Sequence, residues 1–174
     1  MVSDNDSSIS PATVAIREEA QRLSGRVGEA LLARQWHVAT AESCTGGLIA
    51  AFLTDIAGSS SWFGFGWVSY ANAAKRQMLG ISPTTLLEHG AVSEPVVSQM
   101  AETALQSADA DIAIAVSGIA GPGGATATKP VGTVWHAWAT ETGVTTHQAV
   151  YPGERDEVRL RTAVCALAGI LERV

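Results

Sequence analysis

This sequence has few cysteines, few lysines and no long hydrophobic run. The first and the last of these argue against a disulfide-rich protein and against a membrane-spanning one. Only two cysteines, Cys44 and Cys165, occur among 174 residues, so no disulfide framework is expected and reduced intracellular thiols are the simpler interpretation. No apolar run approaches the roughly 20 residues of a membrane-spanning helix. No basic segment followed by an apolar one opens the chain either. We therefore expect a soluble cytoplasmic protein without a membrane partner.

Basic residues are also few relative to acidic ones. The chain has 11 Lys and Arg against 17 Asp and Glu, which gives a net charge of −6 and a pI near 5.1. Nucleic acid is therefore not an expected partner, because binding it requires a basic surface. A local basic pocket is still compatible with this balance. No spacing of cysteines or histidines matches a zinc site, so no metal is expected.

The overall composition is that of one compact domain. Hydrophobic residues make up 47% of the chain and charged residues 16%, which is typical of a globular protein with a full core. Residues 1–11 predict a disordered tail, so the domain is expected to span residues 12–174. Ser10 and Pro11 also predict the cap and first turn of a helix. Helices and strands mix without an internal repeat, which predicts the α/β class: a single three-layer α/β/α domain with a mixed sheet.

The stretch 40–47, Thr-Ala-Glu-Ser-Cys-Thr-Gly-Gly, is the feature around which we expect the fold to be organised. Apolar segments at 36–41 and 48–56 predict a strand, a tight turn and a helix. The nucleophile-capable side chains of the turn then lie at a helix N-terminus, where unpaired N–H groups favour negative charge. Such a turn could attack a carbonyl and hold the oxyanion, bind a phosphate, or simply cap a helix. The sequence leaves open whether Ser43 or Cys44 faces a site.

A second glycine-rich segment follows the most apolar strand that we expect. Residues 111–117 are apolar without alternation, which is typical of a central strand buried on both faces, and they lead into the loop 118–124. Ligands of open α/β sheets bind beyond the carboxyl ends of strands. The turn at Ser43 and this loop should therefore lie on one rim.

The remaining elements follow from periodicity and turn residues. Residues 59–65 are expected to form a turn-rich connection. Further strands are expected at 67–70, 132–139 and 145–151, and helices at 11–31, 71–79, 82–89, 93–105 and 155–173.

A serine nucleophile needs a base, and few side chains can supply one. Lys75 follows an expected strand among small residues, and burial would lower its pKa enough to make it a base. Tyr70, five residues earlier, could relay a proton; the alternative is that Lys75 is a solvated surface lysine. Lys129 lies beside the second glycine-rich loop, where it contacts an anion or is only a surface charge. No local pattern supports a Ser-His-Asp triad for any histidine: His37, His89, His136 or His147.

Six stretches, taken in order, resemble the CinA C-terminal domain family, whose stand-alone members are nicotinamide mononucleotide amidohydrolases. The resemblance covers roughly residues 12–174, and linked motifs are far more specific than a single turn. The stretches are 41–47 (AESCTGG), 68–75 (VSYANAAK), 89–94 (HGAVSE), 117–124 (SGIAGPGG), 129–134 (KPVGTV) and 153–155 (GER).

The resemblance implies hydrolysis of the carboxamide of nicotinamide mononucleotide to nicotinate mononucleotide and ammonia, in pyridine nucleotide salvage. It implies Ser43 as the nucleophile, Lys75 as the base with Tyr70 beside it, and N–H groups of residues 44–47 as the oxyanion hole. It implies no cofactor and a homo-oligomer. Arg155 and the second loop are expected to hold the phosphate, and Ser117 keeps the hydroxyl of the family's threonine. The substrate-binding residues implied are Thr45, Gly46, Gly47, Ser117, Gly121, Gly123, Gly124 and Arg155.

Residues 62–67, Trp-Phe-Gly-Phe-Gly-Trp, depart from the family pattern, which carries a charged pair near Gly64 and Phe65. The departure affects either a substrate contact or an oligomer interface. Two other classes of function also stay open. One is a nucleotide-binding module that uses the glycine-rich loops as anion cradles without turnover. The other is a structural or regulatory subunit whose five tryptophans form a partner surface.

Overall fold

The computed structural model describes residues 10–174, so residues 1–9 of the predicted tail lie outside the described residues. The strands are β1 (Val38–Glu42), β2 (Phe63–Val68), β3 (Ile112–Gly118), β4 (Thr133–Thr140) and β5 (Gly143–Val150). The helices are α1 (Pro11–Arg34), α2 (Leu48–Thr54), α3 (Asn72–Leu79), α4 (Pro83–His89), α5 (Glu94–Ala108) and α6 (Arg155–Leu171), with a 3₁₀ turn η1 (Ser59–Ser61).

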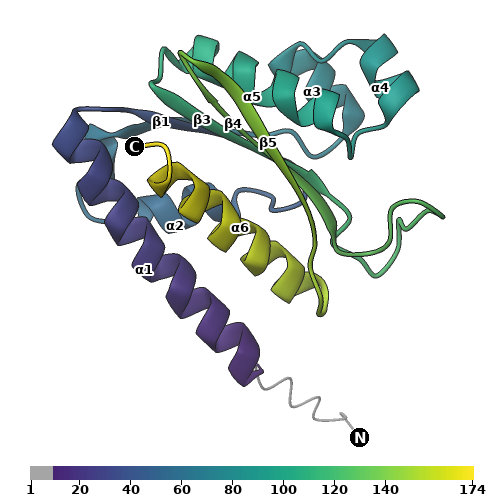
Figure 1. The fold of residues 1–174 in the computed structure, drawn as a ribbon, viewed down its shortest axis with the longest axis horizontal. Helices are drawn as coiled ribbons and strands as arrows, with labels where there is room; N and C mark the ends of the chain where they lie inside the picture. Colours follow the sequence, from purple (N-terminus) through teal and green to yellow (C-terminus); the bar gives the residue numbers. More distant parts are fainter. Residues whose placement is uncertain (1–9) are drawn as a thin grey trace, which may run out of the picture.

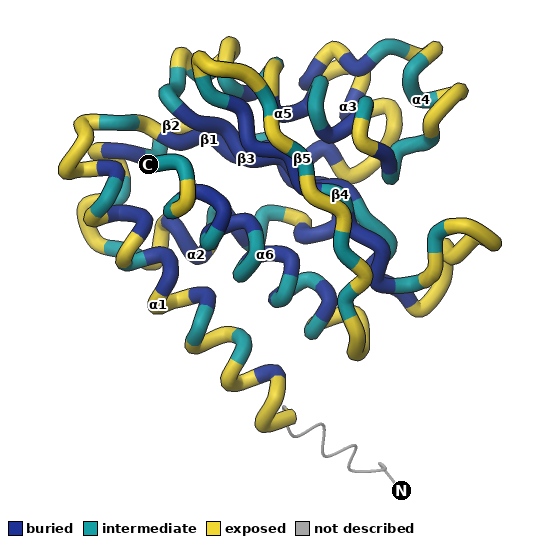
Figure 2. The backbone as a smooth tube through the Cα atoms, in the orientation of Figure 1, coloured by how far each residue is buried: buried dark blue, intermediate teal, exposed yellow. Residues whose placement is uncertain are grey.

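The strands form one mixed sheet in the order β2-β1-β3-β4-β5. The pairs β1–β2 and β1–β3 are parallel, and the pairs β3–β4 and β4–β5 are antiparallel. Every residue of β1 and β3 is buried except Gly118, and Figure 2 shows this buried centre. The apolar run at 111–117 is therefore a central strand, as its lack of alternation predicts.

Helices cover both faces of the sheet (Figure 1). On one face lie α2 and α6, with α1 packed mainly against these two helices; on the other lies α5, with α3 and α4 packed against it. A separate apolar cluster fills each space between sheet and helices. The predicted three-layer α/β/α domain with a mixed sheet is confirmed.

The first helix starts where the sequence predicts. The backbone N–H of Thr13 donates to Ser10 Oγ at 3.0 Å, and Pro11 occupies the first turn, where its missing N–H costs nothing. Its apolar stripe, which includes Leu23, Val27 and Leu31, is buried against the rest of the domain. That burial orients α6, which carries Arg155 at its first turn.

The strand predicted at 67–70 is wrong in its position. β2 begins at Phe63, inside the segment 59–65 predicted as a turn-rich connection, and ends at Val68, so it shares only residues 67–68 with the predicted strand. The two glycines of β2 suggested a turn, but close packing against β1 explains one of them, because a Cβ at Gly66 would lie 2.8 Å from Thr40 Oγ1. Gly64 is the extra residue in an irregularity of the β1–β2 register. Tertiary pairing thus overrides the local turn signal.

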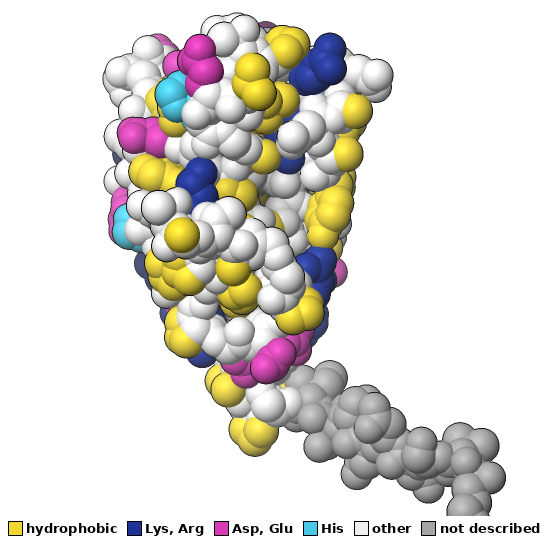
Figure 3. Space-filling model, turned by 90° about the vertical axis from the view of Figure 1, so that its right-hand side faces the viewer, with side chains coloured by type: hydrophobic (Ala, Val, Ile, Leu, Met, Phe, Trp, Pro, Cys, Tyr) yellow, Lys and Arg dark blue, Asp and Glu magenta, His cyan; other side chains and the backbone are white. Residues whose placement is uncertain are grey.

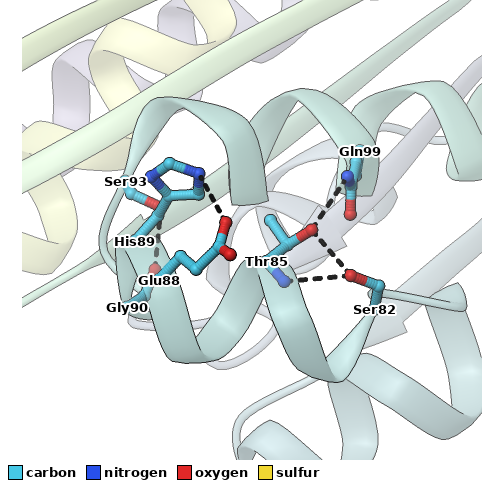
Figure 4. A network of polar contacts seen from close by, with 7 residues as sticks. All are labelled: Ser82, Thr85, Glu88, His89, Gly90, Ser93 and Gln99. Atoms are coloured by element: carbon cyan, nitrogen blue, oxygen red, sulfur yellow. Dashed lines mark hydrogen bonds and ion pairs between the residues drawn. The ribbon is translucent and has the colours of Figure 1, made fainter.

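Polar contacts join α4 to α5 and fix the connection between them (Figure 4). Ser82 caps α4 by accepting from the N–H of Thr85 at 2.9 Å, and Gln99 Nε2 on α5 donates to Thr85 Oγ1 at 3.3 Å. Ser93 precedes α5 as predicted, but its hydroxyl donates to the carbonyl of Gly90 at 2.7 Å instead of capping the helix. These bonds fix the short α4–α5 connection that lies against the end of β3.

Surface side chains of both charges are interspersed with hydrophobic ones on the face that Figure 3 presents. Across residues 10–174, none of the helices combines the length and the hydropathy needed to cross a membrane.

Candidate active site

Ser43 lies at the carboxyl end of β1, immediately before the turn that leads to α2. Its N–H donates to the carbonyl of Val116 on β3 at 3.0 Å, which continues the sheet pairing to the edge of the turn. Its side chain is largely buried. The strand, tight turn and helix predicted from the sequence are therefore present, with the hydroxyl at the rim of the sheet.

Lys75 on α3 contacts this hydroxyl directly. Lys75 Nζ donates to Ser43 Oγ at 2.8 Å and to the carbonyl oxygen of Ser69 at 2.7 Å. The side chain is 1% exposed, so the alternative of a solvated surface lysine is wrong. Two residues 32 positions apart in sequence are thus brought together by the β1 turn and α3.

The environment of Lys75 favours its neutral form. Burial lowers the pKa of this amine from its usual value of 10.5 to about 8, because a charged ammonium loses its hydration inside the protein. At neutral pH an appreciable fraction of Lys75 is therefore unprotonated. In that fraction the Ser43 hydroxyl donates across the same contact, and Lys75 Nζ accepts.

Cys44 has a different environment from its neighbour. Its side chain packs in a small apolar cluster with Ala120, Val134 and Val158. Burial raises the pKa of the thiol to about 12, so it stays protonated at neutral pH. Of the two side chains left open by the sequence, Ser43 is the one hydrogen-bonded to the amine.

Glu42, the last residue of β1, is a site residue that the sequence reasoning missed. Its carboxylate is completely buried and accepts three backbone N–H groups at the start of α2. Gly47 and Ile49 donate to Oε2 at 3.0 Å each, and Ala50 donates to Oε1 at 2.8 Å. A carboxylate six residues before the start of α2 was the available signal, since such groups satisfy the free N–H groups of the first turn.

The amides of the turn itself divide into two groups. The N–H of Gly46 donates to the carbonyl of Ser43, and the N–H of Gly47 goes to Glu42. Within residues 10–174, the N–H groups of Cys44 and Thr45 have no acceptor in another residue. Of the predicted oxyanion donors at residues 44–47, these two amides are the ones without a protein acceptor, and Cys44 also lines the cavity beside Ser43.

A cavity of about 210 Å³ opens beside Ser43 at the carboxyl ends of β1 and β3. Both glycine-rich segments therefore share one rim, as the fold class predicts. The lining residues are Ser43, Cys44, Tyr70, Gly118, Ile119, Ala120, Gly121, Gly123, Gly124 and Arg155. They include the predicted loop glycines, the predicted tyrosine and the predicted arginine.

Arg155 and Tyr70 form the outer wall of this cavity. Arg155 Nη1 donates to the carbonyl of Gly121 at 2.6 Å, and its Nη2 donates to the Tyr70 hydroxyl at 2.6 Å. Tyr70 is 56% exposed. Within residues 10–174 its hydroxyl makes no hydrogen bond to Ser43 or Lys75, so Tyr70 contacts the arginine and not the base.

The other predicted substrate-binding residues do not line the cavity beside Ser43. Thr45 is fully buried, and its carbonyl accepts from Arg159 Nη2 on α6 at 2.6 Å. Gly46 and Gly47 have φ of 61° and 93°, a region that glycine enters without strain. Ser117 donates its hydroxyl to the carbonyl of Ala91 at 2.8 Å. These residues shape the two loops, and Arg159 is a contact that the sequence did not predict.

The remaining candidate bases and cavities lie away from Ser43. None of the four histidines lines its cavity, and Lys129 donates to the carbonyl of His89 at 3.2 Å. A larger cavity of about 530 Å³ lies between α1, α6 and β5. Its lining includes Cys165 and His147, but among the described residues no hydrogen bond joins this thiol to the imidazole. Among residues 10–174, no group of three or more His, Cys, Asp and Glu side chains is arranged to hold a metal ion.

Residues 20–174 match the family model described as the CinA C-terminal domain. The chain belongs to the CinA C-terminal domain family. The resemblance inferred from the six motifs is therefore confirmed, and it extends over most of the chain.

Related members of the CinA C-terminal domain family carry a functional name. A protein of Enterobacter agglomerans named nicotinamide-nucleotide amidohydrolase PncC is 56% identical over 146 residues, which are 83% of this chain and 89% of that protein. The protein of the same name in Escherichia coli strain K12 is 55% identical over 150 residues, 86% of this chain and 91% of that protein.

A solved structure of the CinA C-terminal domain family has the same fold. The competence/damage inducible protein CihA of Agrobacterium tumefaciens is 46% identical, with a TM-score of 0.86 that covers 88% of this chain and 94% of that one. The fold of this chain is thus that of a solved relative.

Proposed function

We propose that the protein hydrolyses the carboxamide of nicotinamide mononucleotide, releasing nicotinate mononucleotide and ammonia, in pyridine nucleotide salvage. The observation that carries the proposal is the 2.8 Å contact between Ser43 Oγ and the buried amine of Lys75. A serine beside a desolvated amine is an activated nucleophile. The names of the relatives from Enterobacter agglomerans and Escherichia coli support the choice of substrate.

The first half-reaction transfers the acyl group to Ser43. Neutral Lys75 takes the proton of the Ser43 hydroxyl as Oγ attacks the carboxamide carbon. The free amides of Cys44 and Thr45 donate to the oxyanion that forms. Protonated Lys75 then gives its proton to the departing nitrogen, which leaves as ammonia, and an ester remains on Ser43.

The second half-reaction cleaves that ester. Lys75, neutral again, takes a proton from water, which attacks the ester carbonyl within the same oxyanion site. Collapse of the intermediate returns the proton to Ser43 Oγ and releases nicotinate mononucleotide. All groups in these steps belong to the chain, the substrate and water, so the proposal requires no metal or organic cofactor.

The other end of the substrate is assigned to the cavity's outer wall. Arg155 supplies a guanidinium suited to a phosphate, and the loop 121–124 supplies backbone groups close to it. Tyr70 accepts a hydrogen bond from Arg155, so we assign Tyr70 to orienting the arginine. This assignment replaces the proton relay expected from the sequence, since the Tyr70 hydroxyl is not bonded to Lys75.

The direct test is incubation of the purified chain with nicotinamide mononucleotide, with ammonia and nicotinate mononucleotide measured together. We expect the two products in equal amounts, and a much higher KM for the nucleoside that lacks the phosphate. Binding of unchanged substrate after long incubation would instead support the nucleotide-binding module. A stable protein complex without affinity for the substrate would support the structural subunit.

The homo-oligomer expected from the sequence is also a proposal, and the edge strand β2 is its most suitable interface. Among residues 10–174, β2 pairs with β1 alone, so in the described sheet its outer backbone groups can pair with another strand. The stacked rings of Phe65 and Trp67 on β2 are partly exposed to solvent, and Phe65 is 52% exposed. Residues 56–74 contain no charged side chain, although the chain carries a net charge of −6. Electrostatic repulsion between two copies is therefore weakest at this edge. A twofold axis there would pair β2 of one copy with β2 of the other.

Replacing Phe65 with glutamate is expected to convert this dimer to monomers, because two copies of the new charge would face each other across the axis. Sedimentation equilibrium at micromolar concentration measures the change. Leu87→Glu on α4 is the matched control, since Leu87 is 87% exposed and lies away from β2. A monomeric wild type, or a Phe65→Glu variant that stays dimeric, would contradict the interface.

A further inference from the structure

Glu42 places a buried negative charge directly behind the proposed nucleophile. The side chain is 0% exposed, and its two oxygens accept from the N–H groups of Gly47, Ile49 and Ala50 at 2.8–3.0 Å. The first N–H groups of α2 have no acceptor within the helix, so they need one from elsewhere. In this protein an internal carboxylate is that acceptor.

The same residue also fixes the group that holds Lys75. The carbonyl of Glu42 accepts from the N–H of Ser69 at 2.8 Å, and the carbonyl of Ser69 in turn accepts from Lys75 Nζ at 2.7 Å. The side chain of Glu42 thus holds the turn that follows Ser43, and its backbone holds the loop residue that binds Lys75. Both connections start from the end of β1. Neither connection passes through the cavity or its phosphate side.

In the turn that Glu42 closes, most of the other hydrogen bonds are made to carbonyl groups: Ser43 accepts from the N–H of Gly46, and Thr45 accepts from Arg159. The turn contains two consecutive glycines with positive φ, Gly46 and Gly47, and glycine has the greatest backbone freedom of any residue. The N–H of Gly47 is held by Glu42 alone among the described residues. Without the carboxylate, the described residues of α2 would hold the turn only through the N–H of Leu48, which donates to the carbonyl of Thr45 at 3.3 Å, and the N–H of Ala51, which donates to the carbonyl of Gly47 at 2.9 Å. Neither bond fixes the N–H of Gly47.

We infer that Glu42 is a positioning residue: its carboxylate accepts the N–H groups at the start of α2 and holds the nucleophile turn in its active conformation. The inference rests on the proposed amidohydrolase function. It also assigns substrate phosphate to the Arg155 side of the cavity and away from α2, because the N–H groups at α2 are already occupied. Glu42 touches no reacting atom, so its effect should appear in turnover and not in substrate binding.

The test is Glu42→Gln, which keeps the shape of the side chain but replaces one acceptor oxygen with an N–H donor. At least one of the three amides then faces a donor instead of an acceptor. We expect kcat for nicotinamide mononucleotide to fall about 100-fold, the effect of losing one oxyanion donor. KM should change by less than about threefold, since ground-state binding is unaffected. Hydrogen exchange at Ile49 and Ala50 should become at least about tenfold faster, since their N–H groups lose a buried acceptor.

Leu31→Ala on α1 is the control for a merely destabilising change. Leu31 is fully buried on α1 and takes part in none of the hydrogen bonds of residues 43–47, so its truncation is expected to lower stability without removing a bond of the turn. We expect this variant to recover full kcat on cooling, when the folded fraction is restored, whereas Glu42→Gln stays slow at every temperature.

The outcomes separate this inference from the proposed function. An active wild type with an equally active Glu42→Gln, or with a Glu42→Gln that recovers on cooling like Leu31→Ala, would overturn the role of Glu42. An inactive wild type would overturn the proposed function instead. Even with an inactive wild type, we expect hydrogen exchange at Ile49 and Ala50 to be faster in Glu42→Gln, because the carboxylate accepts their N–H groups. Unchanged exchange would contradict these hydrogen bonds.

Discussion

Ser43→Ala is expected to lower kcat/KM for nicotinamide mononucleotide by at least about 10,000-fold, because removal of a nucleophile abolishes the covalent route. The hydroxyl is the only group of the turn bonded to the Lys75 amine among the described residues. Binding of the mononucleotide should persist, since Arg155 and the loop 121–124 are untouched. Steady-state ammonia release and equilibrium binding measure the two effects separately.

Cys44→Ala distinguishes the two adjacent nucleophile candidates. The Cys44 thiol is buried among Ala120, Val134 and Val158 and has a pKa raised to about 12. Alanine keeps the backbone N–H, so activity should stay within about tenfold of the wild type. A fully active Ser43→Ala together with an inactive Cys44→Ala would assign the nucleophile to the thiol.

Lys75→Met is expected to lower kcat by about 1,000-fold, the usual contribution of a general base and acid. In the wild type the base must be unprotonated. Activity should therefore rise about tenfold per pH unit below the lysine pKa of about 8 and level off above it. At pH 7 the lowered pKa provides about 300 times more neutral amine than an ordinary lysine would have. The residual activity of Lys75→Met should lack this rise, and an activity that falls between pH 6 and 9 would contradict a neutral lysine base.

The same substitution should reveal how much the buried amine of Lys75 destabilises the folded protein. The pKa of Lys75 is 10.5 in an unfolded chain and about 8 in the folded one. Between these values the unfolded chain binds more protons, so wild-type stability increases with pH in this window. Below about pH 8 both states are protonated, and the full penalty of about 3 kcal/mol is present. The stability of Lys75→Met relative to the wild type should therefore decrease by about 3 kcal/mol between pH 8 and 10.5 in urea denaturation.

Much of the site was predictable because few residues could perform the chemistry. Ser43 stands in a strand–turn–helix pattern, and only two lysines were available as a base. The apolar, non-alternating run at 111–117 identified the central strand, and the rule for α/β sheets placed both loops on one rim. The contact between Ser43 and Lys75 follows from these features together with the family resemblance.

The parts that could not be predicted depend on tertiary contacts. The position of β2 is set by its pairing with β1, which overrides the turn signal of Gly64 and Gly66. The direction of the Cys44 thiol depends on apolar neighbours from β4 and α6. The partners of Tyr70 and Glu42 come from backbone and side-chain groups that are adjacent only after folding. No local spacing encodes such contacts.

The most direct test of the account is to stop turnover of nicotinamide mononucleotide with acid and locate any covalent adduct by fragmentation mass spectrometry. The account predicts the acyl group of nicotinate mononucleotide on Ser43, present in the wild type and absent from Ser43→Ala. An adduct on Cys44, or rapid hydrolysis through Ser43→Ala without any adduct, would contradict it.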